Sequence, residues 1–222
     1  MHTDCAEALP FENRTVAGAA LARRLAGIHW RDPAVVLGLP RGGVPVAKAV
    51  ASALHLPLDV LVVRKIGHPQ HPEFAIGAVA AGGITVRNPD QDTSISVECF
   101  EALAAEQRIE VEKRETRFRP GKPPLSLAGM TAILVDDGLA TGATMRAALL
   151  AARAMGAKHR VVAVPLGDRN VVHQLEDHAE EVICLYCPEP FQSVGFHYAD
   201  FAQLGDAEVR TALCGLRGAS PH

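Results

Sequence analysis

The stretch AILVDDGLATGAT, residues 132–144, combines residue types that suit one kind of ligand. Four apolar residues lead into two adjacent aspartates, Asp136 and Asp137, and a short loop with glycines and threonines follows. Carboxylates accept hydrogen bonds from hydroxyl groups, whereas the free N–H groups at the start of a helix bind anions. Because the acids and the anion-binding loop adjoin, the stretch predicts a site for a sugar phosphate.

The loop residues support this interpretation. Gly138 and Gly142 allow the backbone to turn tightly and to approach a ligand closely. Thr141 and Thr144 add hydroxyl donors beside the backbone N–H groups. The alternative is an ordinary strand–turn–helix with an acidic N-cap, but adjacent acids at a buried strand end repel each other and need partners.

The pattern resembles the signature of the type I phosphoribosyltransferases, which bind 5-phosphoribosyl-1-pyrophosphate (PRPP). The resemblance implies that Asp136 and Asp137 hold the ribose 2- and 3-hydroxyls and that residues 139–144 cradle the 5-phosphate. In hypoxanthine–guanine members an extra aspartate occupies the position of Ala140, so this residue argues against that substrate class. The PRPP-binding residues implied in this stretch are Asp136, Asp137, Gly138, Leu139, Ala140, Thr141, Gly142, Ala143 and Thr144.

A second glycine-rich segment, GLPRGGVPVA (38–47), follows an apolar run. Gly42 and Gly43 expose backbone N–H groups, and the forked cation of Arg41 lies beside them, which suits a pyrophosphate. A plain β–α turn is the alternative. The family has a pyrophosphate loop at this place, often with a strained peptide bond, so the resemblance favours the functional interpretation.

The segment VRKIGHPQHPEF (63–74) carries two cations at a strand exit, Arg64 and Lys65. Buried cations of this kind need anions as partners. The family carries a mobile loop here that closes over the active site. His68 and His71 could contact pyrophosphate or act as acid–base groups, or they could be ordinary polar loop residues.

The resemblance also implies a reaction. A nitrogen nucleophile would displace pyrophosphate at the anomeric carbon of PRPP, through a transition state that resembles an oxocarbenium ion. We expect the cations Arg41 and Lys65 to be catalytic, because negative charge grows on the leaving pyrophosphate. Asp137 is expected to be catalytic as well. The sequence holds no cluster of metal ligands, so Mg²⁺ should arrive on the oxygens of PRPP. The acceptor is expected to be a small nitrogenous base, which points to nucleotide salvage.

The elements that must position these residues alternate along the chain. Such alternation predicts an α/β protein with a mainly parallel sheet, and the resemblance implies the three-layer phosphoribosyltransferase fold with one antiparallel strand and a small hood. The predicted strands are 34–40, 57–66, 131–137, 160–166 and 181–187, the predicted helices are 14–27, 44–56, 141–156 and 168–179, and a hairpin is expected at 75–88.

We expect one domain, 1–222. Within it, a helical insertion spans 96–129, where charged residues recur at helical spacing, and it could belong to the hood or form a contact in a homodimer. A C-terminal hood or tail spans 188–222 and carries an aromatic cluster. The cluster could stack on the base or could simply anchor the tail. The candidate base-binding residues are Phe196, His197 and Tyr198.

The composition is that of an ordinary α/β protein. The net charge of the 222 residues is −3, which gives no reason to expect nucleic acid or a membrane as partner. No apolar run approaches the length of a bilayer span, and five scattered cysteines favour a reduced, cytoplasmic setting. Two other functions stay open: a non-catalytic regulator that senses PRPP, and a generic nucleotide-binding domain.

Overall fold

The computed structural model of the chain describes residues 9–30, 32–71, 74–88 and 95–214. Its main sheet has five parallel strands in the order β2-β1-β6-β7-β8. Parallel strands with helical crossovers confirm the predicted α/β class and the mainly parallel sheet. The strands are β1 (Ala34–Gly38), β2 (Leu58–Val60), β6 (Thr131–Val135), β7 (His159–Leu166) and β8 (Glu181–Tyr186).

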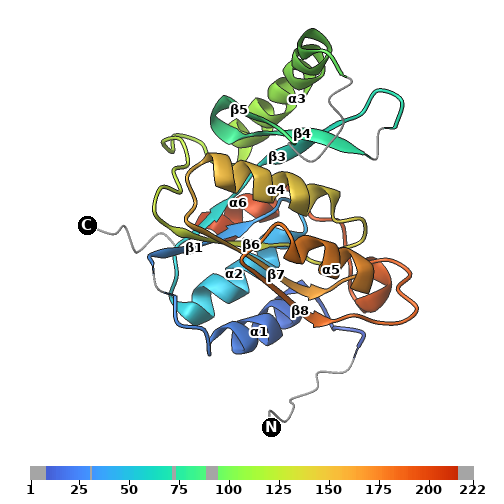
Figure 1. Cartoon of the computed structure of the whole chain (residues 1–222). Helices are drawn as coiled ribbons and strands as arrows, with labels where there is room; N and C mark the ends of the chain where they lie inside the picture. Colours follow the sequence, from blue (N-terminus) through green and yellow to red (C-terminus); the bar gives the residue numbers. More distant parts are fainter. Residues whose placement is uncertain (1–8, 31, 72–73, 89–94, 215–222) are drawn as a thin grey trace.

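Helices cover both faces of this sheet (Figure 1). The helices α1 (Arg14–Leu25) and α2 (Gly43–Leu54) pack on one face, and α4 (Ala143–Ala154) and α5 (Arg169–Glu176) pack on the other. Successive strand residues therefore enter opposite cores: Leu134 lies under α4, whereas Ile133 lies against α1 and α2.

A second, three-stranded antiparallel sheet packs against α4. Its strands are β3 (Val63–Gly67), β4 (Ala75–Ala80) and β5 (Ile84–Arg87), and the hairpin turns through a 3₁₀ segment, Ala81–Gly83. The long helix α3 (Val97–Phe118) lies on the outer face of this sheet (Figure 1). We call α3 with β3–β5 the arm.

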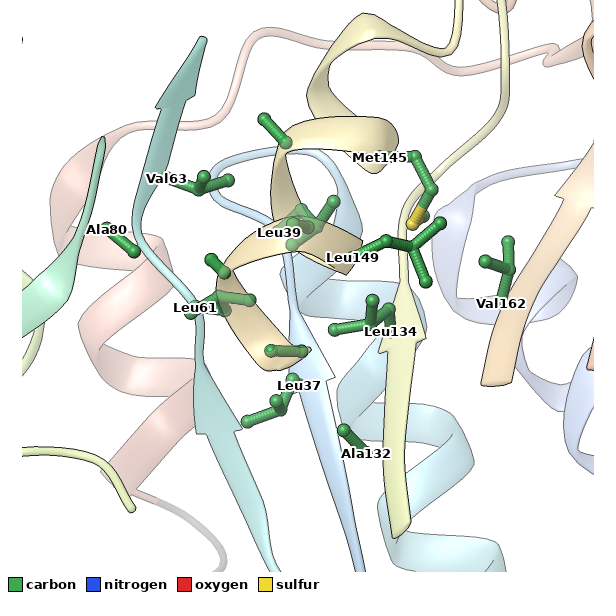
Figure 2. Close-up of a cluster of buried hydrophobic side chains, with 14 of the residues drawn as sticks. Leu37, Leu39, Leu61, Val63, Ala80, Ala132, Leu134, Met145, Leu149 and Val162 are labelled. Atoms are coloured by element: carbon green, nitrogen blue, oxygen red, sulfur yellow. The ribbon is translucent and has the colours of Figure 1, made fainter. Parts of the chain in front are cut away.

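One core joins the arm to the main sheet through α4. Figure 2 shows Leu149 of α4 beside Leu134 of the main sheet, with Leu39 between this pair and Val63 and Ala80 of the arm. All of these side chains are buried. The arm is therefore held by shared apolar contacts, and its position relative to α4 is determined by packing.

The predicted strand 57–66 is divided in the structure. β2 pairs with β1, and after Leu61 and Val62 the chain leaves the main sheet and continues as β3, antiparallel to β4. The antiparallel strand that the resemblance implied is present, but it lies in a separate sheet. The division was not visible in the sequence because Val60, Leu61 and Val62 are all buried, so no polar residue marks the exit.

The C-terminal segment divides into two parts. Residues around the short 3₁₀ segment Gly195–His197 lie near the end of β6, whereas α6 (Asp206–Cys214) packs on α2 and α3. Residues 1–8 and 215–222 of the expected domain lie outside the described residues. Among the described helices, none has the length and apolar character that a bilayer span requires.

Candidate functional site

Three of the segments singled out in the sequence meet at the carboxyl end of the main sheet. A cavity of about 550 Å³ is lined by Pro40 of the loop after β1, by β3 with the loop that follows it, and by Thr141, Ala143 and Thr144 at the start of α4. In open parallel sheets this edge is where ligands bind. The structure thus brings together segments that are about 100 residues apart in sequence.

The loop after β1 packs directly on the acids after β6. The peptide bond between Pro40 and Arg41 is cis. A Cβ atom on Gly42 would overlap the Asp137 carboxylate, and one on Gly43 would overlap the carbonyl oxygen of Val135. Both positions therefore require glycine, and the side chain of Arg41 is exposed beside them.

Asp136 is partly buried behind this loop, and its Oδ1 accepts a hydrogen bond from the backbone N–H of Asp137 at 2.9 Å. Burial raises the pKa of the Asp136 carboxyl well above its usual value, and the neighbouring charge of Asp137 raises it further. A carboxyl group held in this way is costly to keep ionised, which is typical of a functional position rather than of a helix cap.

Asp137 is held by a residue that the sequence analysis missed. Nε of Arg14 donates to Oδ2 of Asp137 at 2.8 Å, and the two side chains are only 11% and 13% exposed. Arg14 also donates to the carbonyl of Ala202 at 2.9 Å, and its guanidinium lies 3.8 Å from the ring centre of Phe201. The first helix and the C-terminal segment therefore meet on this acid.

One signal could have identified Arg14. It is the first residue of α1, where a cation is opposed by the positive end of the helix dipole, and the first turn contains no acid. A residue that is unfavourable for its own helix, with no neighbour in the helix to offset it, often lies at a functional site, and Arg14 fits this description.

The loop between the acids and α4 is fixed by backbone hydrogen bonds. Leu139 N–H donates to the carbonyl of Leu166 at 3.0 Å, and Gly142 adopts a left-handed conformation with φ 69°. Arg146 reaches back from α4 and donates to the carbonyl of Thr141 at 2.6 Å. The side chains of Thr141 and Thr144 remain exposed at the cavity, beside the amino end of α4.

The three aromatic candidates differ in exposure. Phe196 is 60% exposed and lies edge-on to His197 at 5.3 Å between ring centres. His197 is buried, and its Nε2 has no hydrogen-bond partner among the described residues. Tyr198 is buried as well, and its hydroxyl donates to the carbonyl of Asp137 at 2.7 Å. The Tyr198 hydroxyl therefore holds the backbone of Asp137. Phe196 is the candidate whose ring is exposed and can contact a ligand.

The arm contributes residues that were not expected. Leu103, Gln107 and Arg114 of α3 line the cavity together with Arg64 and Lys65 of β3. The sequence predicted that 96–129 belongs to the hood or forms a contact in a homodimer, because helical spacing does not reveal which element a helix face will meet.

The last candidates are the two loop histidines and any side chains that could bind a metal ion. His68 lines the cavity and stacks on His71, with 5.5 Å between ring centres. Within the described residues, no group of three or more His, Cys, Asp or Glu side chains is arranged to hold a metal ion. The carboxylates of Asp136 and Asp137 are the acidic groups next to the two glycine-rich loops.

The chain is similar to known proteins in sequence and in structure. The sequence model of the phosphoribosyl transferase domain matches residues 12–200. Two Mycobacterium tuberculosis proteins, named "Putative phosphoribosyl transferase Rv0571c" and "Putative phosphoribosyl transferase MT0597", are each 47% identical over 201 residues. The match covers 90% of this chain but 45% of each mycobacterial protein, so the chain spans about half the length of these relatives.

A solved structure is similar over almost the whole chain. The crystal structure of TT1426 from Thermus thermophilus superposes with a TM-score of 0.88 at 43% sequence identity. The match covers 94% of this chain and 99% of TT1426.

Proposed function

Because the chain belongs to the phosphoribosyl transferase family, we propose that it binds PRPP with Mg²⁺ at the carboxyl end of the main sheet. It would transfer the phosphoribosyl group to a nitrogenous base and release pyrophosphate. The observation that carries the proposal is the meeting of two glycine-rich loops, a pair of acids and a cation-lined cavity at one sheet edge. Each part suits a different group of PRPP.

The ribose and the 5-phosphate would occupy the end near α4. The carboxylates of Asp136 and Asp137 accept hydrogen bonds from the ribose hydroxyls. The N–H groups of residues 138–144 and the hydroxyls of Thr141 and Thr144 bind the 5-phosphate at the amino end of α4, where the helix dipole favours negative charge. This assignment accounts for the raised pKa of Asp136, which a structural role would not require.

The pyrophosphate would lie between the Arg41–Gly43 loop and β3. Charge develops on this group as the bond to the anomeric carbon breaks, and preorganised N–H groups with the cations of Arg41 and Lys65 stabilise it. When bound, Mg²⁺ neutralises part of the same charge through the oxygens of PRPP. Asp137, held by Arg14, stays oriented toward the ribose during this step.

The acceptor base would bind near residues 196–198. Phe196 has an exposed ring that can stack on a planar base, and His197 Nε2 could bond to a polar group of the base. Tyr198 would act through Asp137, because its hydroxyl is bonded to the carbonyl of that residue.

A thermal shift experiment tests PRPP binding. PRPP with Mg²⁺ at about 100 times Kd should raise the free energy of unfolding by about 2.7 kcal/mol. The double variant Asp136→Asn with Asp137→Asn should lose the shift. The matched control is Glu176→Gln with Asp177→Asn, an adjacent pair at the exposed end of α5, which should keep it. An unchanged melting curve at millimolar PRPP would contradict the proposal.

Pyrophosphate release across purines, pyrimidines and small amines then separates enzyme from sensor. Release with one class of acceptor identifies a transferase and its substrate. If the protein binds PRPP but releases no pyrophosphate with any acceptor in the panel, the non-catalytic regulator is favoured.

A further inference from the structure

All the described side chains that line the cavity and carry a fixed charge are positive. Its described lining includes Arg64, Lys65 and Arg114, and it contains no Asp or Glu. Cations brought together around a partly enclosed space repel one another, and an anion with several charges removes this cost. The cavity therefore suits a polyanion.

Two of the cations belong to the contact between α3 and β3. Arg64 Nε donates to Oε1 of Gln107 at 3.2 Å, which turns the Arg64 side chain toward α3. Gln107 and Arg114 are seven residues apart, so they lie on the same face of the helix. Arg114 makes no hydrogen bond or ion pair with the residues that the structure describes, and it is partly buried.

An acid that interacts with both arginines, Glu110, does not line the cavity. Glu110 lies between Gln107 and Arg114 on the helix, but its carboxylate bonds to Lys113 at 3.1 Å and is 46% exposed. It is not among the residues that line the cavity. Its negative charge interacts electrostatically with Arg114 and Arg64, so it offsets part of their positive charge without lining the cavity.

The opposite wall of the cavity is formed by Pro40 and by the start of α4. A PRPP molecule with its 5-phosphate at α4 would direct its pyrophosphate along the loop at Pro40 toward β3 and α3. We propose that Arg114, together with Arg64 as oriented by Gln107, binds the pyrophosphate, so that α3 is part of the substrate site. This inference rests on the proposed function and adds a binding residue from the long helix.

Calorimetric titration of the full chain with two separate probes tests the inference. The probes are inorganic pyrophosphate with Mg²⁺, and ribose 5-phosphate. Arg114→Gln should weaken pyrophosphate binding about tenfold, the usual effect of losing a charge-assisted hydrogen bond, and leave ribose 5-phosphate binding unchanged. Arg114→Lys should give an intermediate loss, because lysine keeps the charge but not the fork.

Two further variants complete the test. Arg117→Gln is the matched control: it lies on α3 but pairs with Asp206 of α6, so neither affinity should change. Glu110→Gln should tighten pyrophosphate binding about twofold, because it removes a negative charge that acts on Arg64 and Arg114. Because Glu110 acts on both arginines, this variant tests the charge of the arm, and Arg114→Lys keeps the role of Arg114 testable where Arg114→Gln is poorly folded.

The outcomes separate the two proposals. A wild-type chain that binds neither probe nor PRPP contradicts the proposed function. A wild-type chain that binds pyrophosphate, with Arg114→Gln equally tight or with both probes weakened alike, overturns the role of Arg114 and leaves the proposed function in place.

Discussion

At the scale of single residues, Asp136 is the clearest case of stability given up at the proposed ligand site. Its carboxyl is partly buried, lies beside a second acid, and has a raised pKa. A group with a raised pKa binds more protons in the folded state than in the unfolded state. Its contribution to stability is therefore full below the usual pKa of 3.8 and is lost as the pH rises through the folded value.

The raised pKa of Asp136 predicts how Asp136→Asn changes the stability of the fold. The amide keeps an oxygen that accepts from the Asp137 N–H, but it carries no charge. At pH 7 the variant should be more stable by about 1 kcal/mol, or roughly 3 °C in Tm. The advantage should shrink as the pH approaches 4. Thermal melts from pH 4 to 8 check this, and a variant that is less stable at every pH would contradict it.

Arg14 is the second residue with a specific prediction. Its charge opposes the effects of burial and of Asp137 on the pKa of Asp136, and it orients Asp137 directly. Arg14→Gln should therefore weaken PRPP binding and move its pH dependence to higher pH, because Asp136 would ionise less readily.

The measurement is the Kd for PRPP with Mg²⁺ from pH 6 to 9. Arg24→Gln, an exposed arginine on the same helix, is the control and should leave the profile unchanged. A uniform loss of affinity at all pH values would indicate that Arg14 only supports the fold.

At the scale of elements, the arm is tied to the main sheet by Arg119 at the end of α3. This residue is 5% exposed, and its guanidinium donates to Asp59 of β2 at 3.1 Å, to Glu115 at 3.0 Å and to the carbonyl of Pro123 at 3.0 Å. Buried networks of this kind are costly to break because they leave unpaired charges.

Arg119→Gln should therefore lower the free energy of unfolding by about 3 kcal/mol. The value is at the low end for a buried ion pair because Lys122 stays 3.2 Å from Asp59. Arg117→Gln, which breaks an exposed pair on the same helix, should cost less than about 1 kcal/mol. Urea denaturation measures both, and equal losses would contradict the role given to Arg119.

At the scale of the whole molecule, α4 lies between two sheets whose side chains share one core. Leu149 is buried beside residues of β1, β6 and the arm, so the arm and the main sheet should unfold together. Leu149→Ala should lower the free energy of unfolding by about 3 kcal/mol through the cavity it leaves.

The unfolding transition of Leu149→Ala should remain single. The neighbouring Leu150 is only partly buried, and Leu150→Ala should cost about 1 kcal/mol. Melting curves followed by calorimetry and by circular dichroism check both values. Two separated transitions would show that the arm and the main sheet are independent.

The sequence by itself determined the family, because the acids, glycines and threonines that carry the resemblance are adjacent along the chain in residues 132–144. It also determined most elements: α1 begins at Arg14, where the predicted helix 14–27 begins, and β4 and β5 pair as a hairpin within the predicted range 75–88. These features depend on local periodicity, capping and turn chemistry, which a single sequence carries.

Only the tertiary structure decided how distant groups complete the site. Arg14 is 123 positions from Asp137, and Arg114 reaches the cavity only because β3 leaves the main sheet and carries α3 with it. Contacts of this kind depend on how the faces of helices and sheets pack. The types and spacing of residues along the chain do not specify which face packs against which.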